Sequence, residues 1–209
     1  MSRSGRIVLL VTALLSLLAV MSSAAGAVTW HNSGDTAFTA TSGALTFSVT
    51  GPTFTCPGTT ATATVASSPF VGATWTAITG TETYNSCAMG GVGARLDCSF
   101  TFTAQLWTAG PPATTTGSLD ETCGLFEFSS MICRLAGAFH AVYANPSPPS
   151  TFGRFTLTTG GSLVTSNASS GTCPLGTGDR AHFTERTLVV NSATGGPTPH
   201  LGPIITRTS

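Results

Sequence analysis

Hydrophobic and polar residues alternate along much of this chain with a period of two. The clearest segments cover residues 45–50, 100–106, 139–144 and 155–158. In the first of them Leu45, Phe47 and Val49 alternate with Thr46, Ser48 and Thr50. This period places alternate side chains on opposite faces of a β-strand, one facing a core and the other facing water. The pattern therefore predicts strands with one apolar face.

Turn-forming residues separate these segments. Glycine and proline clusters lie at residues 51–52, 90–91, 110–112, 146–149 and 160–161. Beyond the first 27 residues, no amphipathic segment is long enough to predict a helix. Many short strands divided by turns are typical of antiparallel sandwiches and barrels. We therefore expect an all-β fold, an antiparallel β-sandwich or a barrel-like structure.

Residues 1–27 have the organisation of an export signal. Two arginines precede an almost wholly apolar run from Ile7 to Val20, and Ala25-Gly26-Ala27 fits the A-x-A cleavage pattern. The run is shorter than the roughly 20 residues that span a bilayer. We predict a signal helix cleaved between Ala27 and Val28, with a retained membrane anchor as the alternative. The mature chain is then secreted, with no part inserted in a membrane.

The composition excludes some functions of the remaining chain. Only 8% of the 209 residues are charged and none is lysine, whereas about 25% are charged in ordinary globular proteins. So few basic residues cannot form the basic face that nucleic-acid binding requires. The hydrophobic content of 41%, with 12 phenylalanines, distinguishes the chain from a disordered Thr-rich stalk. We expect a folded protein that does not bind nucleic acid.

The predicted domain organisation is one all-β domain over residues 28–190, followed by a flexible tail over residues 191–209. The tail is predicted from its Gly195-Gly196-Pro197 and Gly202-Pro203 segments. A second possibility is two similar β lobes that meet near residue 110. It is suggested by Thr55-Cys56-Pro57 and Thr172-Cys173-Pro174, which place a similar motif in each half.

Six cysteines follow the predicted signal, and an even count in an exported chain indicates disulfides. Folding a hairpin about Gly110–Pro111 places Cys98 opposite Cys123, a separation compatible with a disulfide. A hairpin about Val92–Gly93 instead places Cys87 opposite Cys98. We favour Cys98–Cys123, because its arms are longer, and then expect Cys56–Cys87 and Cys133–Cys173. Each loop of this size stabilises a fold by ~3–4 kcal/mol in the chain-entropy model.

No catalytic or cofactor-binding motif is present in the sequence. His182 follows Asp179-Arg180 and could join a serine and an acid, but a triad is recognised by its geometry. Paired carboxylates for glycoside hydrolysis could come from Glu82, Asp120, Glu121 and Glu127, although solvated positions are the expected places for these residues. The cysteines lack the close pairs of zinc sites. We therefore assign no catalytic, cofactor-binding or metal-binding residue and expect no cofactor.

Two tryptophans are candidates for ligand stacking. Trp75 and Trp107 lie in strand-like segments, and exposed indole rings there could stack on sugars. The alternative is that these rings complete a core, which is common for tryptophans at strand ends. The first reading predicts a carbohydrate-binding surface.

The segments around Cys87 and Cys98 carry a resemblance to a known family. Tyr84 lies three residues before Cys87, a Gly-containing hairpin follows, and Cys98 leads into the aromatic strand at Phe100. In these motifs, and in its other cysteines, the chain resembles small secreted six-cysteine, β-rich proteins of actinobacteria. That family has no assigned activity, so the resemblance implies export and β-structure but no site residues.

These observations predict a secreted, disulfide-linked β-protein that is not an enzyme. We expect a structural or binding component of the cell surface or extracellular space, whose partner is a glycan or another component of the cell envelope. One alternative is a dedicated carbohydrate-binding module. A second is a secreted hydrolase without a recognisable motif.

Overall fold

The structure is a computed structural model of the 209-residue chain. It describes residues 27–48, 53–89, 92–127, 130–158, 161–167, 173, 175, 177–183, 186–192 and 202–208. The predicted signal therefore lies outside the described residues, except for Ala27. Within them the secondary structure is β throughout, and no helix is long and apolar enough to cross a membrane.

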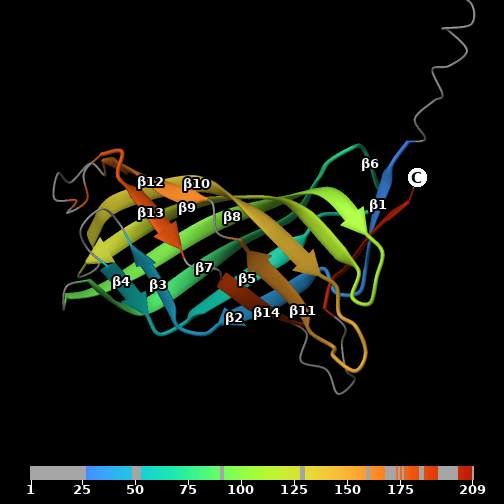
Figure 1. The fold of residues 1–209 in the computed structure, drawn as a ribbon, viewed down its shortest axis with the longest axis horizontal. Coiled ribbons are helices and arrows are strands. Elements are labelled where there is room, and N and C mark those ends of the chain that lie inside the picture. The colour runs from blue at the N-terminus through green and yellow to red at the C-terminus, as the bar shows by residue number, and fades with distance from the viewer. Residues whose placement is uncertain are drawn as a thin grey trace, which may run out of the picture.

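Four long strands form the frame of the molecule, and shorter strands complete it (Figure 1). The long strands are β7 (Trp75–Met89), β8 (Val92–Thr108), β9 (Thr114–Glu127) and β10 (Ser130–Ala144). The shorter ones are β1 (Thr29–Ser33), β2 (Ala37–Ser42), β3 (Leu45–Ser48), β4 (Thr53–Cys56), β5 (Thr59–Val65), β6 (Phe70–Val71), β11 (Gly153–Leu157), β12 (Ser162–Asn167), β13 (Arg180–Phe183), β14 (Arg186–Ser192) and β15 (Ile204–Thr208).

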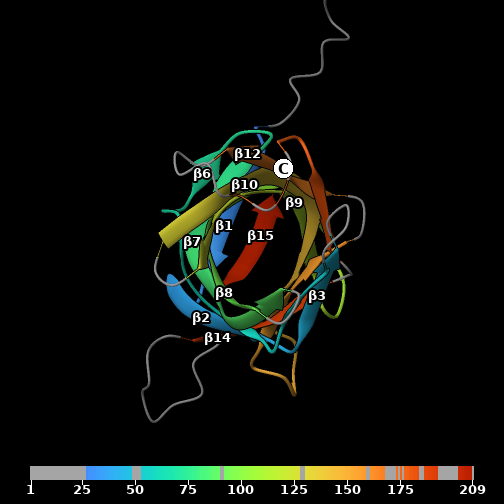
Figure 2. The same ribbon diagram turned by 90° about the vertical axis from the view of Figure 1, so that its left-hand side faces the viewer.

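The long strands belong to two closed antiparallel rings of eight strands each. One ring runs β7-β8-β9-β10-β11-β14-β2-β5 and returns to β7. The other leaves β10 through β12, β13, β3 and β4 before it returns to β7. The result is one elongated barrel, seen along its axis in Figure 2. An all-β barrel was one of the two architectures expected, and that fold class is confirmed.

The alternation in the sequence explains the barrel wall. In β5, Thr59, Ala61, Ala63 and Val65 are buried, and Thr60, Thr62 and Thr64 between them are exposed. The interior of an eight-stranded barrel is wide enough for side chains to fill it or for one small ligand. Buried aromatic rings fill it here, with Phe102 and Phe155 in edge-to-face contact at 4.9 Å between ring centroids. The barrel is thus packed with a core.

A small sheet closes one end of the barrel. It has the order β15-β1-β6, and Figure 2 shows β1 and β15 behind the ring of strands. Trp30 of β1 and Ile205 of β15 are both 0% exposed, and the Trp30 ring lies 6.4 Å from that of Trp75. The prediction of a flexible tail from residue 191 is therefore wrong for β15. Ile205 contributes to the core, and the apolar burial outweighs the local Gly-Pro signals.

The two halves of the chain build one sheet and not two lobes. They are joined where β8 pairs with β9, where β2 pairs with β14 and where β3 pairs with β13. Outward from the β8–β9 hairpin, β7 corresponds to β10, β5 to β11 and β4 to β12, so the halves match in reversed chain order. A tandem duplication would repeat the order, and this arrangement does not.

Three disulfides fasten the wall: Cys56–Cys87, Cys98–Cys123 and Cys133–Cys173. Cys98–Cys123 is the pair favoured from hairpin geometry, and the other two are the pairs expected to follow from it. Cys98 and Cys123 lie directly opposite in the β8–β9 register, although the turn is centred on Pro111 and a register shift between Ala104 and Leu106 restores the expected alignment. Disulfides of this kind persist in oxidising, extracellular environments.

Candidate functional site

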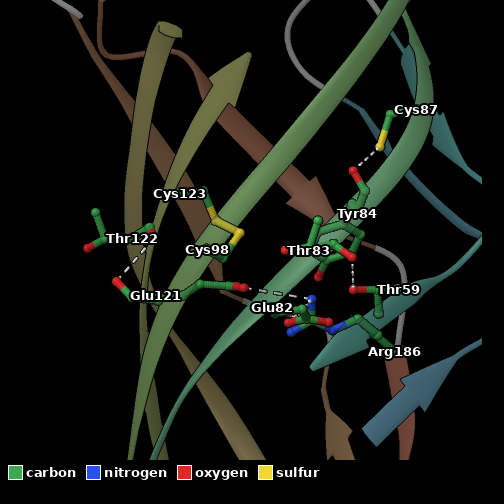
Figure 3. The surroundings of a disulfide bond; sticks show 11 residues. Thr59, Glu82, Thr83, Tyr84, Cys87, Cys98, Glu121, Thr122, Cys123 and Arg186 are labelled. Carbon is green, nitrogen blue, oxygen red and sulfur yellow. Dashed lines mark hydrogen bonds and ion pairs between the residues drawn. A yellow bond between two sulfur atoms is a disulfide. The ribbon is translucent and has the colours of Figure 1, made fainter. Parts of the chain in front are cut away.

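Three ionisable side chains meet inside the barrel, and Figure 3 shows them beside the Cys98–Cys123 disulfide. Glu82 comes from β7, Glu121 from β9 and Arg186 from β14. The Arg186 Nη1 atom lies 3.2 Å from Glu82 Oε2 and 3.8 Å from Glu121 Oε1. Their side chains are only 1–3% exposed. One guanidinium is therefore shared between two carboxyl groups in a core.

Burial dominates the electrostatics of this cluster. It raises the pKa of Glu121 well above its ordinary value, and the charge of Glu82 raises it further. Burial also raises the pKa of Glu82, although Arg186 and the Thr59 hydroxyl oppose that shift. Burial lowers the pKa of Arg186, and the charge of Glu82 opposes that shift by raising the pKa. Because one cation cannot compensate two buried anions, we infer an ionised Glu82 paired with Arg186 and a protonated Glu121.

The space around the cluster is small. A cavity of about 20 Å³ is lined by Glu82, Arg186 and apolar side chains that include Phe100 and Leu188. That volume suffices for one water molecule. The Tyr84 ring covers the guanidinium, with its centroid 5.5 Å from Arg186 Cζ. No sugar or peptide fits in such a cavity, so the two carboxyl groups are not placed to cleave a polymer.

One geometric cluster resembles a metal site. Ligand atoms of Cys98, Glu121 and Cys123 lie within 4.8 Å of one another. The two sulfurs are bonded to each other, so they are not thiolates and do not offer the charge that binds a metal. The cluster is a carboxyl group packed beside a disulfide.

Among the side chains that the structure describes, the other candidate catalytic residues are not gathered into a site. Asp120 is exposed on β9, and Glu127 ends that strand. His182 is exposed on β13 and His140 on β10, where its Nδ1 atom lies 3.3 Å from the Thr158 hydroxyl. His31 pairs with Thr206 in the β1–β15 ladder.

The tryptophans do not form a stacking platform. Trp75 is 2% exposed and packs against Trp30 inside the closed end of the barrel. Trp107 is only partly exposed, packs against the core, and has its indole nitrogen buried. The proposed stacking role is therefore wrong for Trp75, since aromatic burial competes with display on the surface, and for the partly exposed Trp107 it stays a prediction.

The outer face of the barrel carries ordered rows of hydroxyl groups. Thr39, Thr62, Thr81, Ser99 and Thr122 lie in register on five adjacent strands. The Thr62 and Thr81 hydroxyls are 3.2 Å apart. An open hollow of about 510 Å³ lies over this part of β2, β5 and β7. We call this surface the threonine face.

A second hollow lies at the closed end, between the β8–β9 turn and the segment that joins β10 to β11. Its volume is about 190 Å³. It is lined by Pro112, Ala144, Asn145, Ser147, Ser150, Phe152 and Arg154. We call this the end hollow. Phe152 is 50% exposed and Arg154 is also exposed.

The sequence pattern contains a sign of the interior cluster of Glu82, Glu121 and Arg186. Glu82 lies on the same face of β7 as the buried Ile78 and Tyr84, and Glu121 lies between the buried Leu119 and Cys123 along β9. Arg186 likewise occupies the register of the buried Leu188 and Val190. A charged residue at an apolar position of a period-two pattern is a sign of a buried ion pair. The end hollow left no such sign, because its residues come from separate loops.

Comparison with known proteins adds no family to this description. No protein-family model, no curated protein and no solved structure matches the chain.

Proposed function

We propose that this chain is an exported binding or structural protein that works through its outer surface and catalyses no reaction. Export is supported by the predicted signal and by three disulfides, which suit an oxidising environment. The same features support the cell surface or extracellular space as its location.

The observation that carries the proposal is the filled interior of the barrel. The Glu82 carboxyl group faces a cavity of about 20 Å³, which excludes substrates larger than water, and the Glu121 side chain is only 1% exposed. Ligand-binding barrels enclose larger cavities, and pockets for small molecules commonly measure about 300–1,000 Å³. Recognition therefore belongs to the outside, where the threonine face and the end hollow lie.

Glycans are the partner class that these surfaces suit best. Rows of hydroxyl groups with few charges can exchange hydrogen bonds with the hydroxyl groups of sugars. Such a surface is a weak partner for nucleic acid, which requires clustered positive charge. Trp75 is buried and cannot stack on a sugar, so the aromatic ring that we assign to contact the glycan is the exposed Phe152.

Turnover and binding assays on the same preparation test this function. The protein recovered from the culture medium is incubated with ester, peptide and glycoside substrates, and its binding to a glycan array and to cell-envelope polysaccharides is measured. We expect saturable binding and no turnover. Turnover that is lost in His182→Ala would show a hydrolase instead, and a chain that binds neither glycans nor envelope material would contradict the glycan assignment.

A further inference from the structure

The end hollow has walls that are held in place by hydrogen bonds. The Asn145 side chain pairs with Ile205 twice, donating from Nδ2 to the carbonyl at 2.7 Å and accepting from the amide at 2.9 Å. The backbone N–H of Asn145 also donates to the backbone carbonyl of Ala113 in the β8–β9 turn, at 2.9 Å. These bonds join three separate segments at one side of the hollow.

The loop on the other side is also ordered by its own contacts. The Ser150 amide donates to the Ser147 carbonyl at 2.8 Å, and the Phe152 amide donates to Ser150 Oγ at 3.2 Å. Gly202 donates to the carbonyl of Thr151, which ties the loop to the segment before β15. A hollow with fixed walls loses little conformational entropy when a ligand enters.

Phe152 and Arg154 both belong to the wall of the end hollow. Between them Gly153 is buried, and a Cβ atom there would meet the Tyr143 hydroxyl. Phe152 and Arg154 are both exposed and both line the hollow, so the ring and the guanidinium are accessible to the same ligand. Among the residues that line the hollow, Arg154 is the only charged one.

This set of groups has a recognisable chemistry. An exposed aromatic ring offers a flat apolar surface to the C–H face of a sugar, and the serine hydroxyls can bond its oxygens. The guanidinium forms paired hydrogen bonds with a carboxylate or phosphate. A volume of about 190 Å³ suits one ring of a longer ligand better than a drug-sized molecule.

We propose that the end hollow binds an acidic sugar residue of an extracellular glycan, with Phe152 against the ring and Arg154 on its anionic group. The inference rests on the proposed binding function and assigns it a place and a ligand class. The threonine face is the rival place, and it offers hydroxyl groups without a cation among the residues lining its hollow.

Titrations with three probes test the ligand class. They are oligogalacturonate, a neutral oligogalactoside of the same length, and a sugar phosphate, each followed by calorimetry and by NMR. We expect one or both anionic probes to bind and the neutral probe to bind at least about tenfold more weakly, as loss of a charged hydrogen bond requires. The two anionic probes separate a uronic acid from a phosphorylated sugar.

Variants of the full chain test whether the ligand binds in the end hollow. Arg154→Gln and Phe152→Ala are compared with Arg180→Gln, which removes an exposed arginine on β13 in the ring of strands away from the closed end (Figure 1). We expect a loss of at least about tenfold in Arg154→Gln, a smaller loss in Phe152→Ala, and no loss in Arg180→Gln. A thermal unfolding curve for each variant verifies that it is folded.

Three results would overturn the inference. Equal weakening by Arg154→Gln and Arg180→Gln would indicate a general effect of charge. Weakening by the double variant Thr62→Val, Thr81→Val but not by Arg154→Gln would place binding on the threonine face, and the proposed function would survive. Binding of neutral glycans alone would also leave that function intact and end the assignment of an acidic ligand.

Discussion

At the scale of single residues, the unusual feature is a buried group of three ionisable side chains with one cation. Arg186 contacts Glu82 at 3.2 Å and Glu121 at 3.8 Å, and each side chain is almost fully buried. Removing ions from water costs several kcal/mol for each ion. The core tolerates the cluster because Glu82 and Arg186 compensate each other, and because Glu121 keeps its proton.

The stability of the barrel should therefore decrease as pH rises. The folded-state pKa of Glu121 lies well above its ordinary value of 4.5. Between those two values the folded chain binds more protons than the unfolded chain, so the free energy of unfolding falls with rising pH. We expect a slope of up to about 1.4 kcal/mol per pH unit for one proton. Chemical denaturation from acidic to alkaline pH measures it.

Glu121→Gln is the variant that isolates this effect. The amide has nearly the same shape and does not ionise, so the variant should lose the part of the pH slope that Glu121 causes. Asp120→Asn, at the exposed neighbouring position, serves as the control and should retain the slope. An unchanged slope in Glu121→Gln would assign the pH dependence to another group.

Arg186→Met should destabilise the fold more than the loss of an ordinary contact. It leaves Glu82 as a buried carboxylate without its ion pair, which typically costs about 3–5 kcal/mol. The measurement is the free energy of unfolding at neutral pH, with the exposed Arg180→Met as control. Adding Glu82→Gln to Arg186→Met should restore part of the loss, and a failure to do so would show that packing dominates.

At the scale of elements, the β15-β1-β6 sheet acts as a lid on one end of the core. Its attachment combines the buried Trp30 and Ile205 side chains with the two hydrogen bonds between Asn145 and Ile205. The barrel strands hold one another through continuous ladders, whereas this sheet depends on a few contacts. It should open before the barrel does.

Asn145→Ala should loosen that lid selectively. The substitution leaves a buried amide and a buried carbonyl of Ile205 without partners, at about 1–3 kcal/mol for each group. Hydrogen exchange should then accelerate in β1 and β15 and stay unchanged in β8 and β9. Ser147→Ala, in the adjacent loop, is the matched control. Equal acceleration in all strands would mean that the lid and barrel unfold together.

At the scale of the whole molecule, neither half of the chain can close a ring alone. The β8–β9, β2–β14 and β3–β13 pairings each join residues from both sides of the turn near residue 110. Each half would therefore expose open sheet edges, which promote aggregation. We therefore expect the barrel itself to unfold as one cooperative unit built from two mutually dependent halves.

Fragments covering residues 27–110 and 111–209 should therefore not fold when they are produced separately. We expect each fragment to lack a cooperative thermal transition by circular dichroism. Refolding the two together under oxidising conditions should recover such a transition, because each fragment supplies the missing pairs of the other. A stable, cooperative fragment would support two independent lobes instead.

The sequence by itself determined where the strands of this protein form and which disulfide joins β8 to β9. The period-two alternation predicts local extended structure, and hairpin geometry about a strong turn predicts that Cys98 faces Cys123. Both depend on residues that are close in the chain.

Only the tertiary structure decided how the strands close and what they enclose. Pairing between β2 and β14, or between β1 and β15, joins residues more than a hundred positions apart, and no local pattern encodes such a choice. The burial of Trp75, the ordering of Ile205 and the meeting of Glu82 with Arg186 all follow from that closure. Since burial and charge compensation are properties of the assembled core, the functional surface could be located only after the core was known.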